Sequence, residues 1–245
     1  MKNKQTISAV AGAVMLLTSP LALADFANGP DPYAPGFGFA TPDSADWGGW
    51  TRGDAGTLYA EWDDFGAANP VAPDVGSAGT PAASFGWNAG TFVTGTTGNL
   101  YNFGSLQVLT IAVDGSAGPL DGPVVVALQT ETWGTPLEAD DAGNAVAPVT
   151  LNGAQWDSKV VTFQDAAFAS AFGTVLLEQV LFLWTLDAPA ASYEFVLQGG
   201  PHMSFAQAAV DIAPVPLPGA AWLCAPVLAG LLARRHSAVR GASSS

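Results

Sequence analysis

Tryptophan, tyrosine and carboxylate side chains gather in one stretch of the sequence, residues 47–63. A tryptophan or tyrosine ring has a flat apolar face and a polar group at its edge. Such a face can stack on the C–H groups of a sugar while a neighbouring carboxylate accepts hydrogen bonds from the sugar hydroxyls. The stretch therefore predicts a glycan-binding platform, whose candidate residues are Trp47, Trp50, Tyr59, Glu61 and Asp63.

The alternative for these aromatic residues is packing inside the protein, where most tryptophans of a β-domain lie. Residues 56–63 alternate between apolar and polar character, which is the pattern of a half-buried strand. Trp62 falls on the apolar face, so it would belong to the core. Trp47 and Trp50 would then pack the preceding segment against the domain.

A pair of carboxylates would support a different chemistry, the hydrolysis of glycosidic bonds, which needs two acids about 5–10 Å apart. Residues 25–213 lack the side chains of other common sites, since they contain no cysteine, no Gly-x-Ser-x-Gly motif and a single histidine, His202. We predict no catalytic residue, no metal and no cofactor. The alternative is a polysaccharide-active hydrolase, for which the candidate acids are Glu61, Asp63, Glu131, Glu178 and Glu194.

Acidic residues also occur in close pairs, at Asp63-Asp64 and Asp140-Asp141, and Asp43 lies near Asp46. Calcium takes roughly six to eight oxygen ligands, often from loop carboxylates. The spacing of an EF-hand or of a calcium-binding repeat is missing from the sequence. The pairs therefore favour solvated acidic loops over a metal site.

Charge is distributed unevenly along the chain. All 21 acidic residues lie between Asp25 and Asp211, where Arg52 and Lys159 are the only basic residues. Two basic residues against 21 acidic ones leave a net charge of −19 on this segment. Such a surface repels phosphate backbones, which excludes nucleic acid as a partner.

The first 24 residues have the three parts of a secretory signal peptide. Lys2 and Lys4 provide a positive start, residues 7–17 are almost entirely apolar, and Ala22-Leu23-Ala24 places small residues before a cleavage site. The apolar run is shorter than the roughly 20 residues of a membrane span. The sequence predicts export and cleavage by signal peptidase before Asp25.

The C-terminal end has a second ordered set of signals. The proline-rich Val215-Pro216-Leu217-Pro218-Gly219 precedes an apolar run that ends at Arg234-Arg235. The prolines keep the chain extended. Residues 217–233 predict a short transmembrane helix whose inner end is held in the cytoplasm by the arginine pair.

This order of parts resembles the PEP-CTERM sorting signal in its Val-Pro-Leu-Pro-Ala variant, with Gly219 in place of the alanine and Pro226 interrupting the apolar run. The resemblance implies transient anchoring in the inner membrane, processing by an exosortase, and delivery to the cell surface or extracellular matrix of a Gram-negative bacterium. Exopolysaccharide is the candidate ligand. The residues that carry the motif are Val215, Pro216, Leu217, Pro218, Arg234 and Arg235.

The rest of the chain predicts an all-β domain. Residues 25–55 are rich in glycine, proline and aspartate and predict an irregular lead-in, residues 56–213 an antiparallel, jelly-roll-like β-sandwich, and residues 214–245 the sorting signal. We expect one short helix from Asp165 to Phe172, ended by Gly173. The predicted strands are 56–63, 91–94, 106–113, 123–132, 159–164, 174–186, 192–198 and 203–212. Residues 106–113 are apolar on both faces, which predicts a central strand, and residues 192–198 alternate with Tyr193, Phe195 and Leu197 inward. The predicted function is that of a non-catalytic exported protein, structural or glycan-binding.

Overall fold

The computed structural model describes residues 29–66, 68–76, 82–95, 97–117, 120–170 and 173–215. Within these ranges the chain forms antiparallel β-sheets and a single 3-10 turn, η1 (Gly115–Ala117). The predicted signal peptide and the sorting residues Pro216, Leu217, Pro218, Arg234 and Arg235 lie outside the described residues. No helix in the described part is long and apolar enough to cross a membrane.

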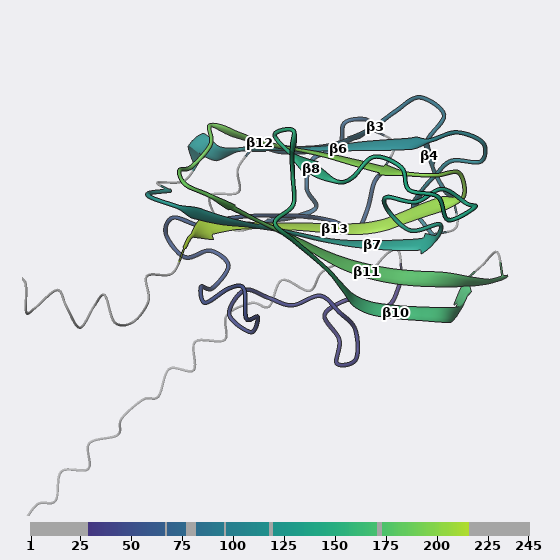
Figure 1. The fold of residues 1–245 in the computed structure, drawn as a ribbon, viewed down its shortest axis with the longest axis horizontal. Coiled ribbons are helices and arrows are strands. Elements are labelled where there is room, and N and C mark those ends of the chain that lie inside the picture. The colour runs from purple at the N-terminus through teal and green to yellow at the C-terminus, as the bar shows by residue number, and fades with distance from the viewer. Residues whose placement is uncertain are drawn as a thin grey trace, which may run out of the picture.

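Two sheets pack face to face in two layers (Figure 1). The larger sheet runs in the order β10 (Ser158–Ser170), β11 (Gly173–Leu186), β7 (Val124–Gly134), β13 (Met203–Pro214), β1 (Leu58–Trp62) and β2 (Val75–Gly76). Beside β1, β13 also pairs with β5 (Leu100–Tyr101), which pairs with β4 (Phe92–Val93). The smaller sheet runs in the order β3 (Ala83–Trp87), β6 (Gln107–Asp114), β12 (Ser192–Gly199), β8 (Thr150–Leu151) and β9 (Ala154–Gln155).

The core lies between the two layers and follows the alternation of the strands. Tyr193, Phe195 and Leu197 of β12 are fully buried, which confirms the predicted inward face of residues 192–198. Aromatic rings join the layers: the Phe195 ring lies 5.6 Å from that of Trp184 in β11. Burying one large apolar side chain stabilises a fold by about 1.5–3 kcal/mol, so this shared core is what holds the two sheets together.

The predicted strands are confirmed, and the predicted helix is wrong. β6 lies inside the smaller sheet, between β3 and β12, as the apolar character of residues 106–113 predicted. The expected helix from Asp165 is instead the continuation of β10, which runs to Ser170 and pairs with β11. Register shifts between Val161 and Phe163 and between Asp165 and Phe168 break the alternation of side chains. These bulges give the strand an apolar spacing that resembles a helix.

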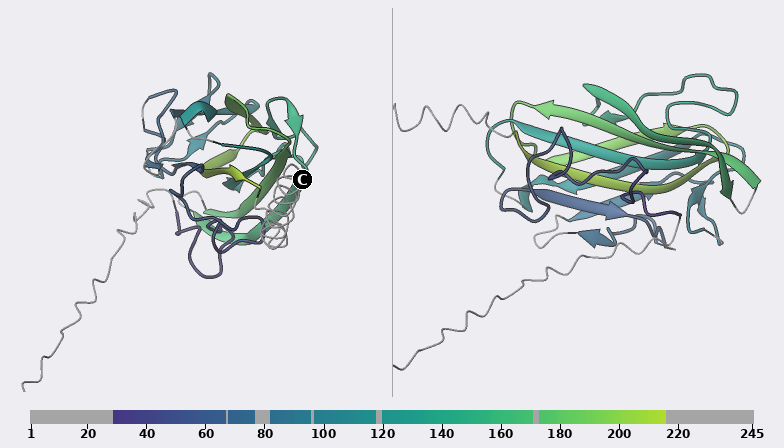
Figure 2. Two further views of the ribbon diagram at one scale, coloured as in Figure 1. Left: turned by 90° about the vertical axis from the view of Figure 1, so that its left-hand side faces the viewer. Right: turned by 90° about the horizontal axis from the view of Figure 1, so that it is seen from below.

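The segment before β1, residues 29–57, is here called the N-terminal arm. It contains turns and one isolated bridge between Pro35 and Phe37, but no strand. The arm runs across the outer face of the larger sheet (Figure 2). A sheet face that would otherwise meet solvent is therefore covered by a segment without regular structure.

Candidate functional site

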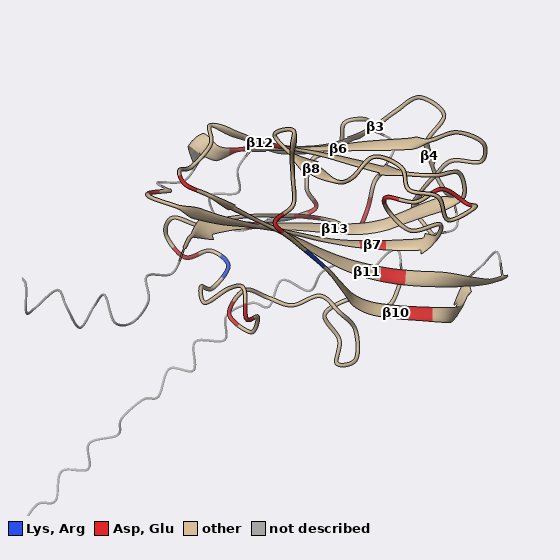
Figure 3. Cartoon of the chain, in the orientation of Figure 1, with Lys and Arg blue, Asp and Glu red and all other residues tan. Residues whose placement is uncertain are grey.

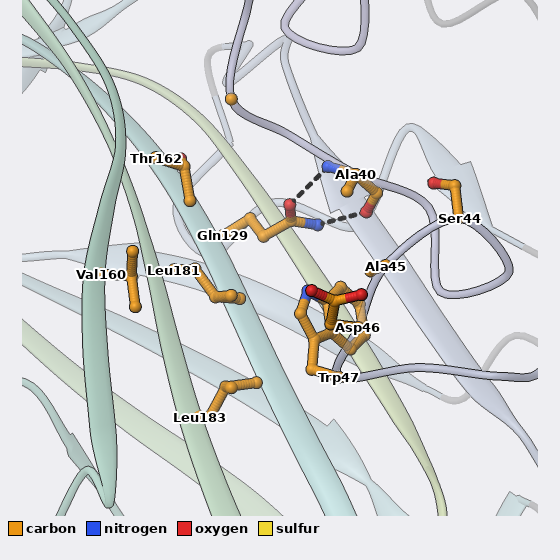
Figure 4. A pocket seen from close by; sticks show the side chains of 11 residues that line it. Ala40, Ser44, Ala45, Asp46, Trp47, Gln129, Val160, Thr162, Leu181 and Leu183 are labelled. Atoms are coloured by element: carbon orange, nitrogen blue, oxygen red, sulfur yellow. Dashed lines mark hydrogen bonds between the residues drawn. The ribbon is translucent and has the colours of Figure 1, made fainter.

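An open groove of about 580 Å³ lies between the N-terminal arm and the outer face of β10 and β11 (Figure 4). One wall comes from the arm and the other from side chains of the larger sheet. The lining includes Ser44, Asp46 and Trp47 on the arm and Gln129, Val160, Leu181 and Leu183 on the sheet. This groove is the candidate functional site.

Two glutamine side chains hold the arm against the sheet. Gln129 of β7 accepts a hydrogen bond from the Ala40 amide at 2.8 Å and donates one to the Ala40 carbonyl at 3.0 Å, as a neighbouring strand would. Gln179 of β11 accepts a hydrogen bond from the Gly38 amide at 2.5 Å. A Cβ at Gly38 would collide with Thr162, so the close approach of arm and sheet requires a glycine there.

A tight loop then turns Trp47 toward the groove. The Gly49 amide donates to the Pro42 carbonyl at 2.7 Å, and a Cβ at Gly48 would collide with that same carbonyl. The rings of Trp47 and Trp50 meet edge to face at 5.7 Å, and both side chains are half-buried. Edge-to-face packing is a favourable arrangement of aromatic rings, so Trp50 supports Trp47 in its position.

The groove combines an apolar wall with a polar rim. Leu181 and Leu183 lie across the groove from Trp47, while the exposed Ser44 and Asp46 supply a hydroxyl and a carboxylate. Ligand sites commonly have this composition, an apolar lining with a few polar groups that set orientation. The arrangement can take a ligand with flat apolar faces and hydroxyl groups at its edge.

A buried charged cluster ties the arm to β1 and β13. This arginine cluster consists of Tyr33, Arg52, Tyr59, Glu61 and Asp211. Arg52 donates from Nε and Nη2 to the two carboxylate oxygens of Asp211 at 2.8 and 2.7 Å. Its Nη1 lies 3.6 Å from Oε2 of Glu61, which also accepts hydrogen bonds from the Tyr33 hydroxyl at 3.0 Å and from the Tyr59 hydroxyl. The guanidinium lies 3.9 Å from the centre of the Tyr59 ring.

Burial decides the protonation behaviour of this cluster. It raises the pKa of Glu61 and of Asp211, and the nearby charge of Arg52 works in the opposite direction. Burial and the charge of Glu61 together raise the pKa of Tyr33 and Tyr59. Both phenols therefore stay protonated and donate hydrogen bonds to Glu61. Although burial acts against it, Asp211 raises the pKa of Arg52. One permanent cation thus serves two buried carboxyl groups.

The structure separates the five predicted glycan-binding residues into two groups. Trp47 lines the groove and Trp50 packs against it. Tyr59, Glu61 and Asp63 are at most 7% exposed, and the first two belong to the arginine cluster. They present no surface to a large ligand. Trp62, by contrast, lies in the core, as the packing alternative predicted.

Several groove residues were missed by sequence reasoning. Gln129, Leu181 and Leu183 come from strands about 80 to 140 residues further along the chain, and only the sheet pairing brings them beside the arm. One signal was present, because Gln129 directly follows the apolar run of residues 124–128 in the middle of a strand. A polar side chain at such a place is expected to have a specific partner.

The acids considered for a glycosidase are not brought together in the groove. Glu131 is fully buried and accepts hydrogen bonds from Trp133 Nε1 at 2.7 Å and from Gln179 Nε2 at 2.5 Å. Glu194 is exposed on the other sheet. Asp46 is the single acid among the groove's lining residues. The hydrolase alternative stays a prediction without a carboxylate pair at this groove.

Two of the acids in the pairs considered for calcium, Asp140 and Asp64, accept hydrogen bonds within the protein. Asp140 accepts hydrogen bonds from the Asn144 side chain at 2.9 Å and from the backbone amides of Asn144 and Ala142 at 2.7 and 3.0 Å, and these bonds lower its pKa. One carboxylate oxygen of Asp74 accepts hydrogen bonds from the backbone amides of Asp63 and Asp64 at 2.9 and 2.6 Å. Within the described ranges no three histidine, cysteine or acidic side chains form a group that could hold a metal ion.

Comparison of the chain with known protein families, with curated proteins and with solved structures gave no match.

Proposed function

We propose that the protein is an exported surface or extracellular-matrix protein whose β-domain, a jelly-roll-like sandwich, binds extracellular polysaccharide without modifying it. The observation that carries the proposal is the groove, in which Trp47 faces a leucine wall beside the polar Ser44 and Asp46. Neutral sugars have apolar ring faces and hydroxyl edges, which match these two kinds of surface.

The charges of the domain favour an uncharged polysaccharide. Acidic residues are spread over both layers (Figure 3), whereas Arg52 and Lys159 are the only basic residues between positions 25 and 213. Both are engaged in ion pairs, Arg52 with Asp211 and Lys159 with Glu138, each at 2.7 Å. An acidic polysaccharide would meet a surface of its own sign without a free cation to bind it.

The delivery route rests on the two ends of the sequence. β13 ends at Pro214, and the Val215 amide donates to the Pro123 carbonyl at 2.8 Å. The proline motif therefore begins directly after the last strand, β13. We propose that residues 217–233 form the transient anchor. Protein recovered from the cell surface of an exosortase-positive host would then start at Asp25 and lack Trp222 to Arg235 by mass spectrometry.

The test of binding uses the full chain, purified from a host without exosortase in a sugar-free detergent. Its affinity is measured by biolayer interferometry for immobilised amylose, mixed-linkage β-glucan, xyloglucan and galactomannan, with alginate as the acidic control. We expect binding to at least one uncharged polymer and none to alginate. Trp47→Ala should weaken that binding at least tenfold, which corresponds to about 1.4 kcal/mol.

Two variants control this test. Trp47→Phe keeps an aromatic face and should retain most of the affinity, while Val161→Ala changes an exposed apolar side chain that does not line the groove. Unchanged affinity in Trp47→Ala would refute the groove as the binding site, and absence of binding to every polymer would overturn the proposed function.

A further inference from the structure

A second aromatic surface lies away from the groove, on the strand pair β4–β5. Of the five large apolar side chains that are exposed in the described part of the chain, three fall between residues 92 and 106: Phe92, Phe103 and Leu106, which are 40%, 67% and 39% exposed. Exposed apolar groups that cluster in this way commonly mark a binding surface. We call Phe92, Tyr101, Phe103 and His202 the aromatic patch.

The rings of the aromatic patch are arranged in an ordered way. Phe92 and Tyr101 are paired across the two strands, and Phe92 stacks on Phe103 with ring centres 5.4 Å apart. Tyr101 meets Phe103 edge to face at 4.9 Å. The Asn102 side chain, itself buried, accepts hydrogen bonds from the amides of Gly104 and Ser105. This turn holds Phe103 outward, so its exposure is built into the fold.

A polar edge accompanies the rings. The Tyr101 hydroxyl and His202 Nδ1 are 2.8 Å apart and joined by a hydrogen bond. His202 has a φ of +64°, a backbone conformation that non-glycine residues seldom adopt. Its amide donates to the Asn102 carbonyl at 2.9 Å, which keeps the imidazole beside the tyrosine. The second ring nitrogen of the exposed His202 is available to a ligand hydroxyl.

The segment that contributes three of the four patch residues is free of charge. Residues 75–113 contain no lysine, arginine, aspartate or glutamate, whereas residues 25–213 together carry a net charge of −19. Two copies of so acidic a domain repel each other, which disfavours self-association through the patch. An uncharged ligand avoids this repulsion.

We propose that the aromatic patch is a second saccharide-binding site, which takes the apolar ring face of an uncharged polysaccharide on Phe103 and its hydroxyls at Tyr101 and His202. This inference rests on the proposed function for its ligand class but on different residues for its site. Along β7, Ala127 pairs with Leu183 of the groove and Gly134 pairs with Met203 beside the patch. Leu181 of the groove pairs with Gln129, so the two sites are about 17–23 Å apart along the strands.

Two separated sites make the protein divalent. A divalent protein binds a long chain more tightly than either site alone does, and it can join two chains. The domain would thus cross-link polysaccharide, which neither site could do by itself.

The test compares the full-length wild type, Phe103→Ala, Trp47→Ala and Val161→Ala in the sugar-free detergent. Affinity is measured on the four uncharged polymers, and cross-linking of the soluble polymer is followed by dynamic light scattering. We expect Phe103→Ala to weaken binding at least fivefold and to abolish the growth in particle size, while Val161→Ala behaves as the wild type. Because the Phe103 side chain is largely exposed, its removal should not unfold the protein. The melting temperature of Phe103→Ala is measured as a control for folding.

The outcomes separate the two proposals. If Phe103→Ala binds and cross-links as the wild type does while Trp47→Ala is impaired, the second site is refuted and the groove stands. If Phe103→Ala loses all binding while Trp47→Ala is normal, the groove is refuted and the patch stands. Absence of binding to all four polymers overturns both proposals. A wild-type dimer in sedimentation velocity that Phe103→Ala dissociates would show a self-association surface instead, and would also overturn the second site.

Discussion

The outer faces of the two sheets differ in what covers them. On the larger sheet, Glu61, Asp211 and Glu131 point away from the core and are nevertheless at most 1% exposed, because the N-terminal arm region lies over them. On the smaller sheet, Thr110 and Glu194 occupy similar outward positions and are exposed. Alternation along a strand therefore identifies the side that faces away from the core, but it does not tell whether that side meets water.

The difference has an energetic consequence. A polar group that is buried without a partner costs roughly 1–3 kcal/mol, and a buried charge costs more. The covered face must therefore provide matched partners, as the arginine cluster and the glutamine contacts do. The open face has no such requirement, and substitutions there should have small effects. The following predictions test this contrast.

The largest effect is expected from removal of the cation that the arm places against β13, Arg52. Arg52→Met leaves Asp211 and Glu61 buried without their positive partner, and breaking a buried ion pair in this way costs about 3–5 kcal/mol. For a domain of this size we expect the melting temperature, followed by tryptophan fluorescence, to fall by about 10 °C. The double variant Arg52→Met/Asp211→Asn should recover part of the loss.

Lys159 provides the matched control, because it is the other basic residue of the domain. Its partner Glu138 also accepts hydrogen bonds from Trp156 Nε1 and from the Val149 amide, and the pair is partly exposed. Lys159→Met should cost about 1 kcal/mol or less. Equal losses for Lys159→Met and Arg52→Met would contradict the expected difference between a buried and a partly exposed ion pair.

A smaller effect is expected from cutting the contact between β7 and the arm. Gln129→Ala leaves the Ala40 amide and carbonyl without their partner, which should cost about 1–3 kcal/mol in the free energy of unfolding by urea. Thr110→Ala on the open face should change it by no more than about 0.5 kcal/mol. Hydrogen exchange of residues 38–42 should rise in Gln129→Ala alone. Unaltered exchange there would show that the glutamine does not hold the arm.

The pH dependence of stability should differ between the two kinds of carboxyl group. Burial raises the pKa of Glu131, whose partners Trp133 and Gln179 are neutral. Its protonation therefore stabilises the fold: this contribution is complete below the ordinary carboxyl pKa and is lost as the pH rises through the raised value. Between pH 7 and pH 5 the wild type should gain more stability than Glu131→Gln, as measured by urea unfolding.

Glu138 should affect the pH dependence of stability in the opposite direction from Glu131. Although its partial burial acts in the other direction, hydrogen bonds from Lys159 and Trp156 lower its pKa. Its contribution is present above the ordinary carboxyl pKa and is lost as the pH falls through the lowered value. Glu138→Gln should therefore lose less stability than the wild type on acidification below pH 5. Identical pH profiles of the wild type, Glu131→Gln and Glu138→Gln would show that burial does not distinguish these groups.

Salt should produce the smallest of these effects. The exposed acids repel one another, and this repulsion is screened over about 8 Å at physiological ionic strength. We expect the melting temperature to rise with NaCl, and only slightly further with millimolar CaCl₂ at matched ionic strength. A large calcium-specific rise would instead indicate a specific site, and the loops around Asp63-Asp64 and Asp140-Asp141 would be examined first.

The strands were predictable because they are encoded locally. Alternation placed Tyr193, Phe195 and Leu197 in the core correctly, and the apolar character of residues 106–113 predicted an internal strand. The helix predicted at Asp165 failed because two bulges alter the side-chain period of β10. Pattern reasoning assumes a constant period, so it cannot detect such shifts.

The candidate site was only partly predictable. Trp47 was identified from its residue type, but its partners come from the distant strands β7, β10 and β11. Tyr59 and Glu61 were assigned to the same surface because they are close in sequence, whereas the arm covers them. Long-range coverage by an irregular segment depends on contacts such as Gln129 with Ala40, and these leave only a weak mark in the sequence.

Hydrogen exchange can show whether the groove between arm and sheet holds an uncharged polysaccharide. The full chain is measured by mass spectrometry with and without a saturating hexasaccharide of the polymer that it binds. A ligand in the groove should slow exchange in the Trp47 loop, residues 41–49, and in the parts of β10 and β11 that form the other wall. Unchanged exchange in both segments under saturating ligand would contradict binding in the groove.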